Sequence, residues 1–232
     1  FKALEKISLK LYKGETLGLI GESGSGKTSL SNAILKIHKF EEGEIFFNGL
    51  DVSKIQGKEL LGFRKNIQIV FQDPYASLNP LHNIYQIISE PLMFHKICRK
   101  EDLYDECKKL INDVGLSENF LNSYPHELSG GQRQRVCIAR AISVKPQVLI
   151  CDESVSALDV SIQATVLNLL NQLKQKYSFT YIFISHDLSV VRHMSDKILV
   201  LHNGKIVEYN DADLLFKKPK DSYTKKLINA SL

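Results

Sequence analysis

The chain has 232 residues, of which 24% are charged and 44% hydrophobic, and its net charge is only +4. This composition excludes disordered and fibrous proteins, and the small charge does not indicate nucleic acid or an anionic membrane as a partner. Apart from glycine, no apolar run exceeds four residues, whereas a transmembrane helix needs about 20. We therefore expect no membrane span. The charged first residues predict no signal peptide, and without an initiator Met we expect that Phe1 is not the native start.

The predicted elements alternate between short β-rich runs and helical patterns. This alternation is typical of an α/β domain with a largely parallel sheet. In the first third of the chain we expect strands at Thr16–Ile20, Ile45–Asn48 and Ile67–Phe71, and a helix from about Lys27 to Ile37.

The middle of the chain, from about Ile84 to Ile142, carries helix signals and no convincing strand. One amphipathic helix is predicted from apolar residues on a single face, namely Leu103, Cys107, Leu110, Ile111 and Val114. We therefore predict one domain over residues 1–232, with a core at about 1–83 and 143–232 and an inserted helical subdomain at about 84–142.

Strands resume at Val148–Cys151, Tyr181–Ile184 and Lys197–Leu201. Between the first two, a long helix is predicted with one apolar face formed by Ile162, Val166, Leu169, Leu170, Leu173 and Tyr177. Asn203-Gly204, between runs at 198–201 and 205–208, predicts a β-hairpin turn.

The four cysteines, Cys98, Cys107, Cys137 and Cys151, include no pair at CxxC spacing. Zinc ligation and thioredoxin-type redox chemistry are therefore not expected. Cys137 and Cys151 lie inside apolar stretches and are predicted to be small buried hydrophobes, and a reducing cytosolic setting fits all four.

Residues 21–28, GESGSGKT, satisfy the GxxxxGK[ST] pattern between a predicted strand and a predicted helix. Glycines let the backbone curl so that N–H groups face phosphate oxygens, and the helix N-terminus adds partial positive charge. Lys27 is predicted to contact the β- and γ-phosphates, and Thr28 offers a hydroxyl to Mg²⁺. The predicted nucleotide-binding residues are Gly21, Glu22, Ser23, Gly24, Ser25, Gly26, Lys27, Thr28 and Ser29. A chance match in a surface turn is disfavoured because both flanks fit.

Two carboxylates, Asp152 and Glu153, follow the buried strand at 148–151. Asp152 is predicted to hold Mg²⁺, and Glu153 to polarise the attacking water. The alternative is that these acidic residues serve a turn or a cap. The presence of Lys27 favours the catalytic interpretation.

A second anion site is predicted at LSGGQ, residues 128–132, just before a helical run. Ser129 is a good N-cap residue, and Gly130 and Gly131 expose backbone N–H groups at a helix N-terminus. The motif at residues 21–28, known as a P-loop, is by itself compatible with kinases, GTPases and helicases. The LSGGQ motif is the feature that distinguishes between these classes of protein.

The ordered motifs resemble the ATP-binding cassette family. They comprise the P-loop, Gln72, LSGGQ, Asp152-Glu153, SALD at 156–159, and His186 after YIFIS. The segments QDPYASLNP at 72–80, GETLGLIGESGSGKT and the tail SYTKKL resemble the oligopeptide, dipeptide and nickel importer branch. The resemblance implies an α/β P-loop NTPase (RecA-like) core with an antiparallel β part and an inserted all-helical subdomain.

The resemblance implies an ATPase that uses ATP and Mg²⁺ to power import of a small solute, either a di- or oligopeptide or nickel, by ATP-driven dimerisation. The implied partners are a second cassette (identical or different), integral membrane permease subunits and, indirectly, a solute-binding protein, with no nucleic acid. The implied location is peripheral, at the cytoplasmic face of the inner membrane.

In this family two cassettes pack head to tail, so Ser129, Gly130, Gly131 and Gln132 would meet the nucleotide on the partner's P-loop. By the same resemblance, His186 would contact the γ-phosphate and steady the water near Glu153. Gln72 would reach Mg²⁺ and water and act with Glu153 and His186 in catalysis. Asp159 would bind at the nucleotide interface and tie the two sites together.

Non-catalytic roles stay open for three of these residues. His186 could be structural, Gln72 could be an ordinary polar loop residue, and Asp159 could cap the helix that follows it. Arg133 and Arg135 could touch nucleotide or the dimer interface, or could equally be solvated. Adenine stacking by Phe1 is not expected, because Phe1 is too close to Lys27.

The competing functions are a cassette of a tandem two-cassette ATPase, an exporter or lipoprotein-release ATPase, a soluble DNA-repair or translation ATPase, and a non-enzymatic cassette. The intact Glu153, Ser129 and His186 disfavour the last of these.

Overall fold

The computed structural model describes residues 2–38 and 40–230, so Phe1 lies outside the described residues. The chain divides into two compact units. Unit 1 combines Phe1–Ile67 with Thr180–Leu232, and unit 2 is Gln68–Phe179.

Unit 1 is built on four neighbouring strands in the order β6 (Thr180–Ile184), β1 (Thr16–Ile20), β7 (Lys197–His202) and β8 (Lys205–Asp211). β1 runs parallel to β6 and β7, and every residue of β1 and β6 is buried. β8 pairs with β7 in the antiparallel sense. The strands predicted at Thr16–Ile20, Tyr181–Ile184 and Lys197–Leu201 are confirmed to within one residue, whereas the run expected at 205–208 continues to Asp211. The unit contains both parallel and antiparallel pairs.

The predicted Asn203-Gly204 hairpin is confirmed. Both residues have positive φ, 47° and 74°, as a type I′ turn requires, and this turn joins β7 to β8. The same dipeptide at Asn48-Gly49, with φ of 51° and 81°, joins two short antiparallel strands, β2 (Phe46–Phe47) and β3 (Leu50–Asp51). The expected strand at Ile45–Asn48 is therefore too long, since Asn48 already belongs to the turn.

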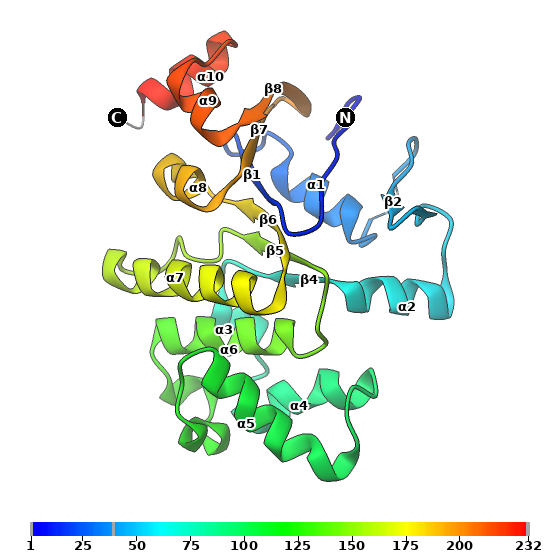
Figure 1. Cartoon of the computed structure of the whole chain (residues 1–232), viewed down its shortest axis with the longest axis vertical. Helices are drawn as coiled ribbons and strands as arrows, with labels where there is room; N and C mark the ends of the chain where they lie inside the picture. Colours follow the sequence, from blue (N-terminus) through cyan, green and yellow to red (C-terminus); the bar gives the residue numbers. More distant parts are fainter. Residues whose placement is uncertain (1, 39, 231–232) are drawn as a thin grey trace. The chain divides into compact units, whose positions relative to one another are not determined.

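The described residues of unit 1 also form five helices, labelled in Figure 1: α1 (Lys27–Ile34), α2 (Gly57–Asn66), α8 (Leu188–Met194), α9 (Ala212–Lys217) and α10 (Ser222–Asn229). α8 packs closely on β1, because a Cβ added to Gly18 would lie 2.5 Å from side-chain atoms of Val191 and Ser195. Only α1 was expected from the hydrophobic pattern.

The predicted end of α1 at Ile37 is wrong, because the helix stops at Ile34 in a Schellman motif. Lys36 adopts a left-handed conformation with φ of 51°. The backbone N–H of Lys36 donates to Ala33 O, and that of Ile37 donates to Asn32 O. Ile37 therefore lies beyond the helix although its apolar side chain continues the helical pattern.

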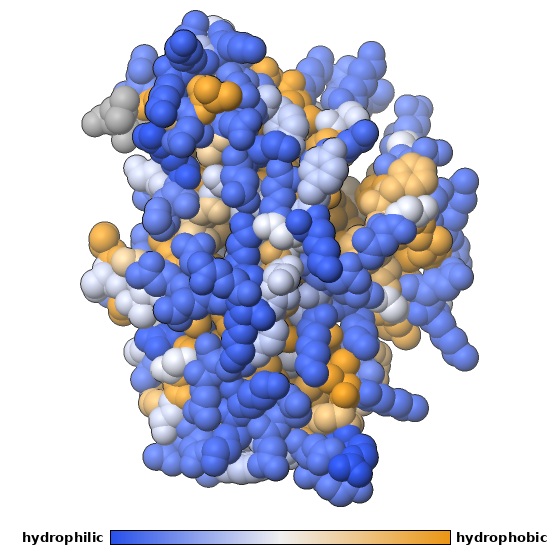
Figure 2. All heavy atoms as spheres, viewed as in Figure 1, coloured by the Kyte–Doolittle hydropathy of each residue, from blue (hydrophilic) through white to orange (hydrophobic). Residues whose placement is uncertain are grey.

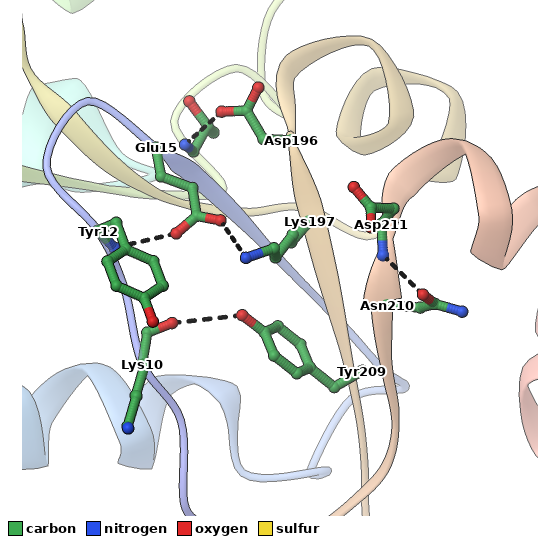
Figure 3. Close-up of polar contacts among 9 residues, drawn as sticks. Lys10, Tyr12, Glu15, Asp196, Lys197, Tyr209, Asn210 and Asp211 are labelled. Carbon is green, nitrogen blue, oxygen red and sulfur yellow. Dashed lines mark hydrogen bonds and ion pairs between the residues drawn. The ribbon is translucent and has the colours of Figure 1, made fainter.

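A set of polar contacts, none of them predicted from the sequence, fixes the amino end of β1 (Figure 3). The Glu15 carboxylate accepts hydrogen bonds from Tyr12 N at 2.9 Å and pairs with Lys197 Nζ at 2.8 Å. The Asp196 carboxylate accepts from Thr16 N at 2.7 Å, and the Tyr209 hydroxyl donates to Lys10 O at 3.3 Å. The hydrogen bond to Glu15 raises the pKa of Lys197.

Unit 2 contains two strands that neighbour each other, β4 (Ile67–Val70, its first residue counted in unit 1) and β5 (Val148–Asp152). Its helices are α3 (Pro74–Ser77), α4 (Ile84–Phe94), α5 (Leu103–Asp113), α6 (Gly130–Ile142) and α7 (Val160–Tyr177). Single 3₁₀ turns occur at Lys100–Asp102, Glu118–Asn122 and Pro125–Glu127.

The helical character predicted for residues 84–142 is confirmed, since every regular element described there is a helix. The predicted apolar face of α5 is buried along its length, including Val114 just after the helix. α5 packs against α4 and α6, and its last residue, Asp113, binds Lys176 and Tyr177 at the end of α7. On α7, the predicted face is buried at Val166, Leu169, Leu170 and Leu173.

Within residues 2–38 and 40–230, the structure has no helix with the length and apolar character needed to cross a membrane. Hydrophilic residues predominate over most of the face drawn in Figure 2, with apolar residues scattered among them.

Candidate nucleotide site

The loop at residues 21–26, which follows β1 and precedes α1, has a backbone that requires glycine. Gly21 and Gly26 have φ of 154° and 109°. A Cβ at Gly21 would lie 2.2 Å from Leu201 O, and one at Gly26 would lie 2.9 Å from Ala3 O. The curled loop is therefore fixed both by its own dihedral angles and by the backbone packed against it.

Lys27, the first residue of α1, is buried at 8% exposure and points its ammonium group back at the loop. Its Nζ donates to Gly21 O at 2.7 Å and to Glu22 O at 2.9 Å. The adjacent Thr28 is exposed, while the buried Ser25 hydroxyl has no hydrogen-bond partner within the described part of the chain. Together these groups place a positive charge and hydroxyl donors in one short segment, a combination suited to phosphate oxygens.

Two distant segments of unit 1 brace this loop. Gly204 N, in the turn of the β7–β8 hairpin, donates to Ser25 O at 2.9 Å. Glu22 N donates to the Tyr223 hydroxyl on α10 at 3.0 Å, across 201 residues of sequence. Neither contact can be predicted from the sequence, because no local pattern links residues so far apart.

His186 lies in the same unit, and the topology brings it to the same edge of the strands as the loop. β1 and β6 are parallel with Leu19 opposite Ile184, so both strands end at that edge. His186 follows β6 by two residues and is exposed. Asp187 caps α8 by accepting hydrogen bonds from Ser189 N and Val190 N. His186 therefore lies in the short connection between the end of β6 and this cap.

The acidic pair lies in unit 2 at the end of a buried strand, and its place after that strand agrees with the prediction. Asp152 is the last residue of β5, and both Asp152 and Glu153 are partly exposed. Glu153 adopts a left-handed backbone with φ of 48°, which is unfavourable for a residue with a side chain. Its carbonyl accepts from Ser156 N at 3.1 Å and Ser156 Oγ at 2.8 Å, and these bonds hold the turn.

Gln72 follows β4 by two residues and is exposed. The next residue, Asp73, caps α3 by accepting from Tyr75 N and Ala76 N. The side chain of Gln72 therefore lies directly before a fixed turn, at the end of the strand that neighbours β5.

The predicted N-cap at Ser129 is confirmed. Ser129 Oγ accepts from Gln132 N at 3.3 Å, and Gln132 Oε1 accepts from Ser129 N at 2.8 Å, which forms a capping box at the start of α6. Arg133 Nη1 donates to Leu128 O at 2.5 Å, and Arg135 Nη1 to Gly115 O at 3.2 Å. Both guanidinium groups therefore anchor neighbouring backbone, a role that neither sequence alternative included.

The second glycine of the signature, Gly131, is required by packing. A Cβ there would lie 2.5 Å from Ile162 Cγ2 on α7, whereas one at Gly130 would meet Leu158 at an ordinary 3.6 Å. We expect Gly131→Ala to lower the free energy of unfolding by about 1–3 kcal/mol through overpacking. Gly130→Ala, the control, should be neutral or slightly stabilising, as Ala is favoured over Gly in helices. Urea unfolding measures both, and equal effects would contradict this account of Gly131.

The capping interpretation of Asp159 is confirmed for its position only. Asp159 does occupy the N-cap position of α7, but its side chain makes no capping hydrogen bond. The helix start is instead satisfied by its backbone carbonyl, which accepts from Ile162 N and Gln163 N. The exposed carboxylate is therefore not committed to the helix.

The interpretation of Cys137 and Cys151 as buried hydrophobes is confirmed. Burial raises the pKa of the Cys137 thiol to about 11 and that of Cys151 to about 12. Both thiols stay protonated near neutral pH and are poor nucleophiles.

Comparison with known proteins identifies relatives over almost the whole chain. Residues 4–156 match the family described as ABC transporter. The oligopeptide transport ATP-binding protein OppF of Streptococcus mutans is 49% identical over 99% of this chain and 75% of its own length. The dipeptide transport ATP-binding protein DppF of Lactococcus lactis is 46% identical over 99% of this chain and 74% of its own.

A solved structure of an ATP-binding cassette, MJ0796, is similar with a TM-score of 0.81 and 30% identity over 90% of each chain. It is described as the dimeric, post-hydrolysis state bound to ADP and Pi.

Proposed function

The chain belongs to the ABC transporter family of ATP-binding cassette ATPases, and from this premise we propose that its ATP hydrolysis drives the import of short peptides across a cell membrane. The observation that carries the peptide assignment is the 46–49% identity to an oligopeptide and a dipeptide transport subunit. These relatives favour peptides over nickel, the other solute suggested by the sequence.

In this proposal ATP binds on the loop of residues 21–29. Backbone N–H groups of the loop and of the first turn of α1 face the phosphates, except those of Glu22 and Ser25, which donate to the Tyr223 hydroxyl and to Glu22 O. The Lys27 ammonium neutralises charge on the β- and γ-phosphates. Support comes from the position of Lys27 Nζ, which already lies within 3 Å of the loop carbonyls Gly21 O and Glu22 O. The ammonium needs no large movement to reach a phosphate held by the same loop.

Hydrolysis is assigned to three side chains. Glu153 polarises the attacking water and accepts its proton, a role worth about 10²–10⁴-fold in rate. His186 hydrogen-bonds the γ-phosphate and steadies that water. Gln72 orients the water and reports nucleotide state to the membrane subunit. The left-handed backbone of Glu153 supports its assignment, because such strain is common at functional sites.

A magnesium ion fits the oxygen donors proposed for it, namely the Thr28 hydroxyl, the Gln72 amide and the Asp152 carboxylate. Among the described residues no group of three or more His, Cys, Asp or Glu side chains could hold a metal alone. Mg²⁺ commonly binds through one or two protein oxygens together with substrate phosphates, which agrees with this sparse set. When bound, the ion neutralises charge on the phosphates.

We assign Ser129, Gly130, Gly131 and Gln132 to the nucleotide of a second cassette, packed head to tail with this one. The capping box orients the N-terminus of α6, whose free N–H groups attract anions. Asp159, whose carboxylate is not used for capping, ties the two nucleotide sites together. The dimeric state of the related cassette supports this assembly, with either an identical or a different partner cassette.

The remaining partners are integral permease subunits, and through them a solute-binding protein, with the cassette peripheral at the cytoplasmic face of the membrane. Nucleic acid has no role in this proposal. An exporter or lipoprotein-release system and soluble repair or translation ATPases are alternatives that the relatives disfavour. A tandem two-cassette protein stays an alternative, because a glutathione import ATP-binding protein is 45% identical over 98% of this chain but only 37% of its own length.

The test is purification of the chain from membranes with its co-purifying subunits, followed by measurement of ATP hydrolysis. We expect two permeases and a second cassette, and a rate that rises when binding protein loaded with a short peptide is added. Binding protein loaded with Ni²⁺ is the matched control. Stimulation by Ni²⁺ alone, or the absence of any permease, would contradict peptide import.

A further inference from the structure

We infer that Tyr223, on the C-terminal helix α10, is a positioning residue that preorganises the nucleotide-binding loop through the Glu22 amide. This inference rests on the proposed function of the loop and assigns a role to a residue outside the motifs that define it. Tyr223 reaches the loop as a hydrogen-bond acceptor for Glu22 N at 3.0 Å.

The Tyr223 ring is held so that its hydroxyl has little freedom. It lies against the His202 ring with a centroid distance of 3.8 Å and an interplanar angle of 32°. His202 is the last residue of β7, and the hairpin turn that follows it donates Gly204 N to Ser25 O. Tyr223 and the hairpin turn therefore hold the loop at two points, Glu22 and Ser25, and Tyr223 also contacts the residue that precedes the turn.

α10 is itself anchored to the strands of unit 1. The Glu208 carboxylate on β8, 8% exposed, accepts from Lys220 N and Asp221 N, each at 3.0 Å. Asp221 then caps α10 by accepting from Tyr223 N at 2.7 Å and Thr224 N at 3.4 Å. A continuous chain of hydrogen bonds thus runs from β8 through the cap of α10 to the loop.

Burial raises the pKa of Tyr223, so the hydroxyl stays neutral near pH 7 and can accept the amide N–H. The Lys27 ammonium binds the carbonyls of Gly21 and Glu22, on either side of that amide. Fixing Glu22 therefore fixes the carbonyls that hold Lys27 before nucleotide arrives. Without the hydroxyl, the loop would become fully ordered only when the nucleotide binds, and the entropy cost of that ordering would weaken the binding.

Tyr223→Phe removes only the hydroxyl and keeps the ring on His202. One hydrogen bond of ordinary strength predicts that the dissociation constant for MgATP and the KM rise by about two- to tenfold. The kcat at saturating ATP should change by less than about twofold, because the loop is ordered once nucleotide is bound. In the nucleotide-free protein, deuterium exchange at the Glu22 amide, followed by NMR, should become faster.

Tyr209→Phe is the matched control. Tyr209 also bonds one backbone group, Lys10 O at 3.3 Å, but near the amino end of β1, away from the loop (Figure 3). Its removal should leave the dissociation constant for MgATP unchanged. The inference is overturned if Tyr223→Phe binds MgATP as the wild type does, or more tightly. It is also overturned if both variants weaken binding equally.

Lys27→Ala separates failure of this inference from failure of the proposed function. If the wild type binds MgATP and Lys27→Ala does not, the loop is the nucleotide site, and the Tyr223 result then judges the inference alone. If the wild type and Lys27→Ala bind MgATP equally, the proposed function fails, and the inference fails with it.

Discussion

Replacing Glu153 with Gln is expected to lower the rate of ATP hydrolysis by about 10²–10⁴-fold while ATP binding persists. Gln keeps the size and the hydrogen-bonding carbonyl of Glu but cannot accept a proton from the attacking water. The backbone of the turn should not change, since the Ser156 contacts are made to the carbonyl of residue 153 and not to its side chain. Single-turnover hydrolysis of radiolabelled ATP measures the rate.

The same variant should accumulate as a dimer in MgATP, because binding proceeds but the step that reopens the dimer does not. Size-exclusion chromatography with and without MgATP detects this change. Glu118→Gln provides the control, as Glu118 is a partly exposed residue of the same unit that pairs with Lys108. Turnover by Glu153→Gln at the wild-type rate would remove Glu153 from the mechanism.

The parts of the fold that the sequence predicted correctly are those with a strong local cause. Buried strands such as β1 and β6 are apolar on both faces, and the Asn-Gly turn needs positive φ at two positions. The short helices α8, α9 and α10 have too few residues for a clear hydrophobic period, and their positions depend on packing against strands. The end of α1 could not be predicted, because the left-handed position of its Schellman motif is occupied by Lys36 and not by the usual Gly.

In the candidate site, too, the local features are predictable from the sequence and the long-range contacts are not. The glycine-rich loop, the N-cap at Ser129 and the carboxylates after β5 each depend on a short contiguous segment, and the sequence predicts these local features at their residues. The contacts of Tyr223 and Gly204 with the loop join segments that meet only after the strands have formed. Arg133 and Arg135 show a related limit, because the carbonyls that bind them are offered by irregular loops.

Lys27→Ala should weaken MgATP binding by at least about 10²-fold, which amounts to loss of binding at ordinary nucleotide concentrations. A hydrogen bond to a charged group is worth about 1.5–3 kcal/mol, and the ammonium is placed to make more than one with the phosphates. Alanine also leaves the phosphate charge without its nearest counter-charge from the chain. Isothermal titration calorimetry with MgATP gives the dissociation constant directly.

Lys36→Ala distinguishes loss of the phosphate contact from loss of stability. The Lys36 ammonium also binds two carbonyls, Ser53 O at 3.0 Å and Ile55 O at 2.9 Å, but it lies just beyond the far end of α1 from the loop. Both variants lose an ammonium held by two carbonyls, so thermal unfolding should register both. Only Lys27→Ala should lose nucleotide. If Lys36→Ala weakened MgATP binding as much, the effect of Lys27 would reflect the integrity of α1, and the loop would lose its assignment as the phosphate site.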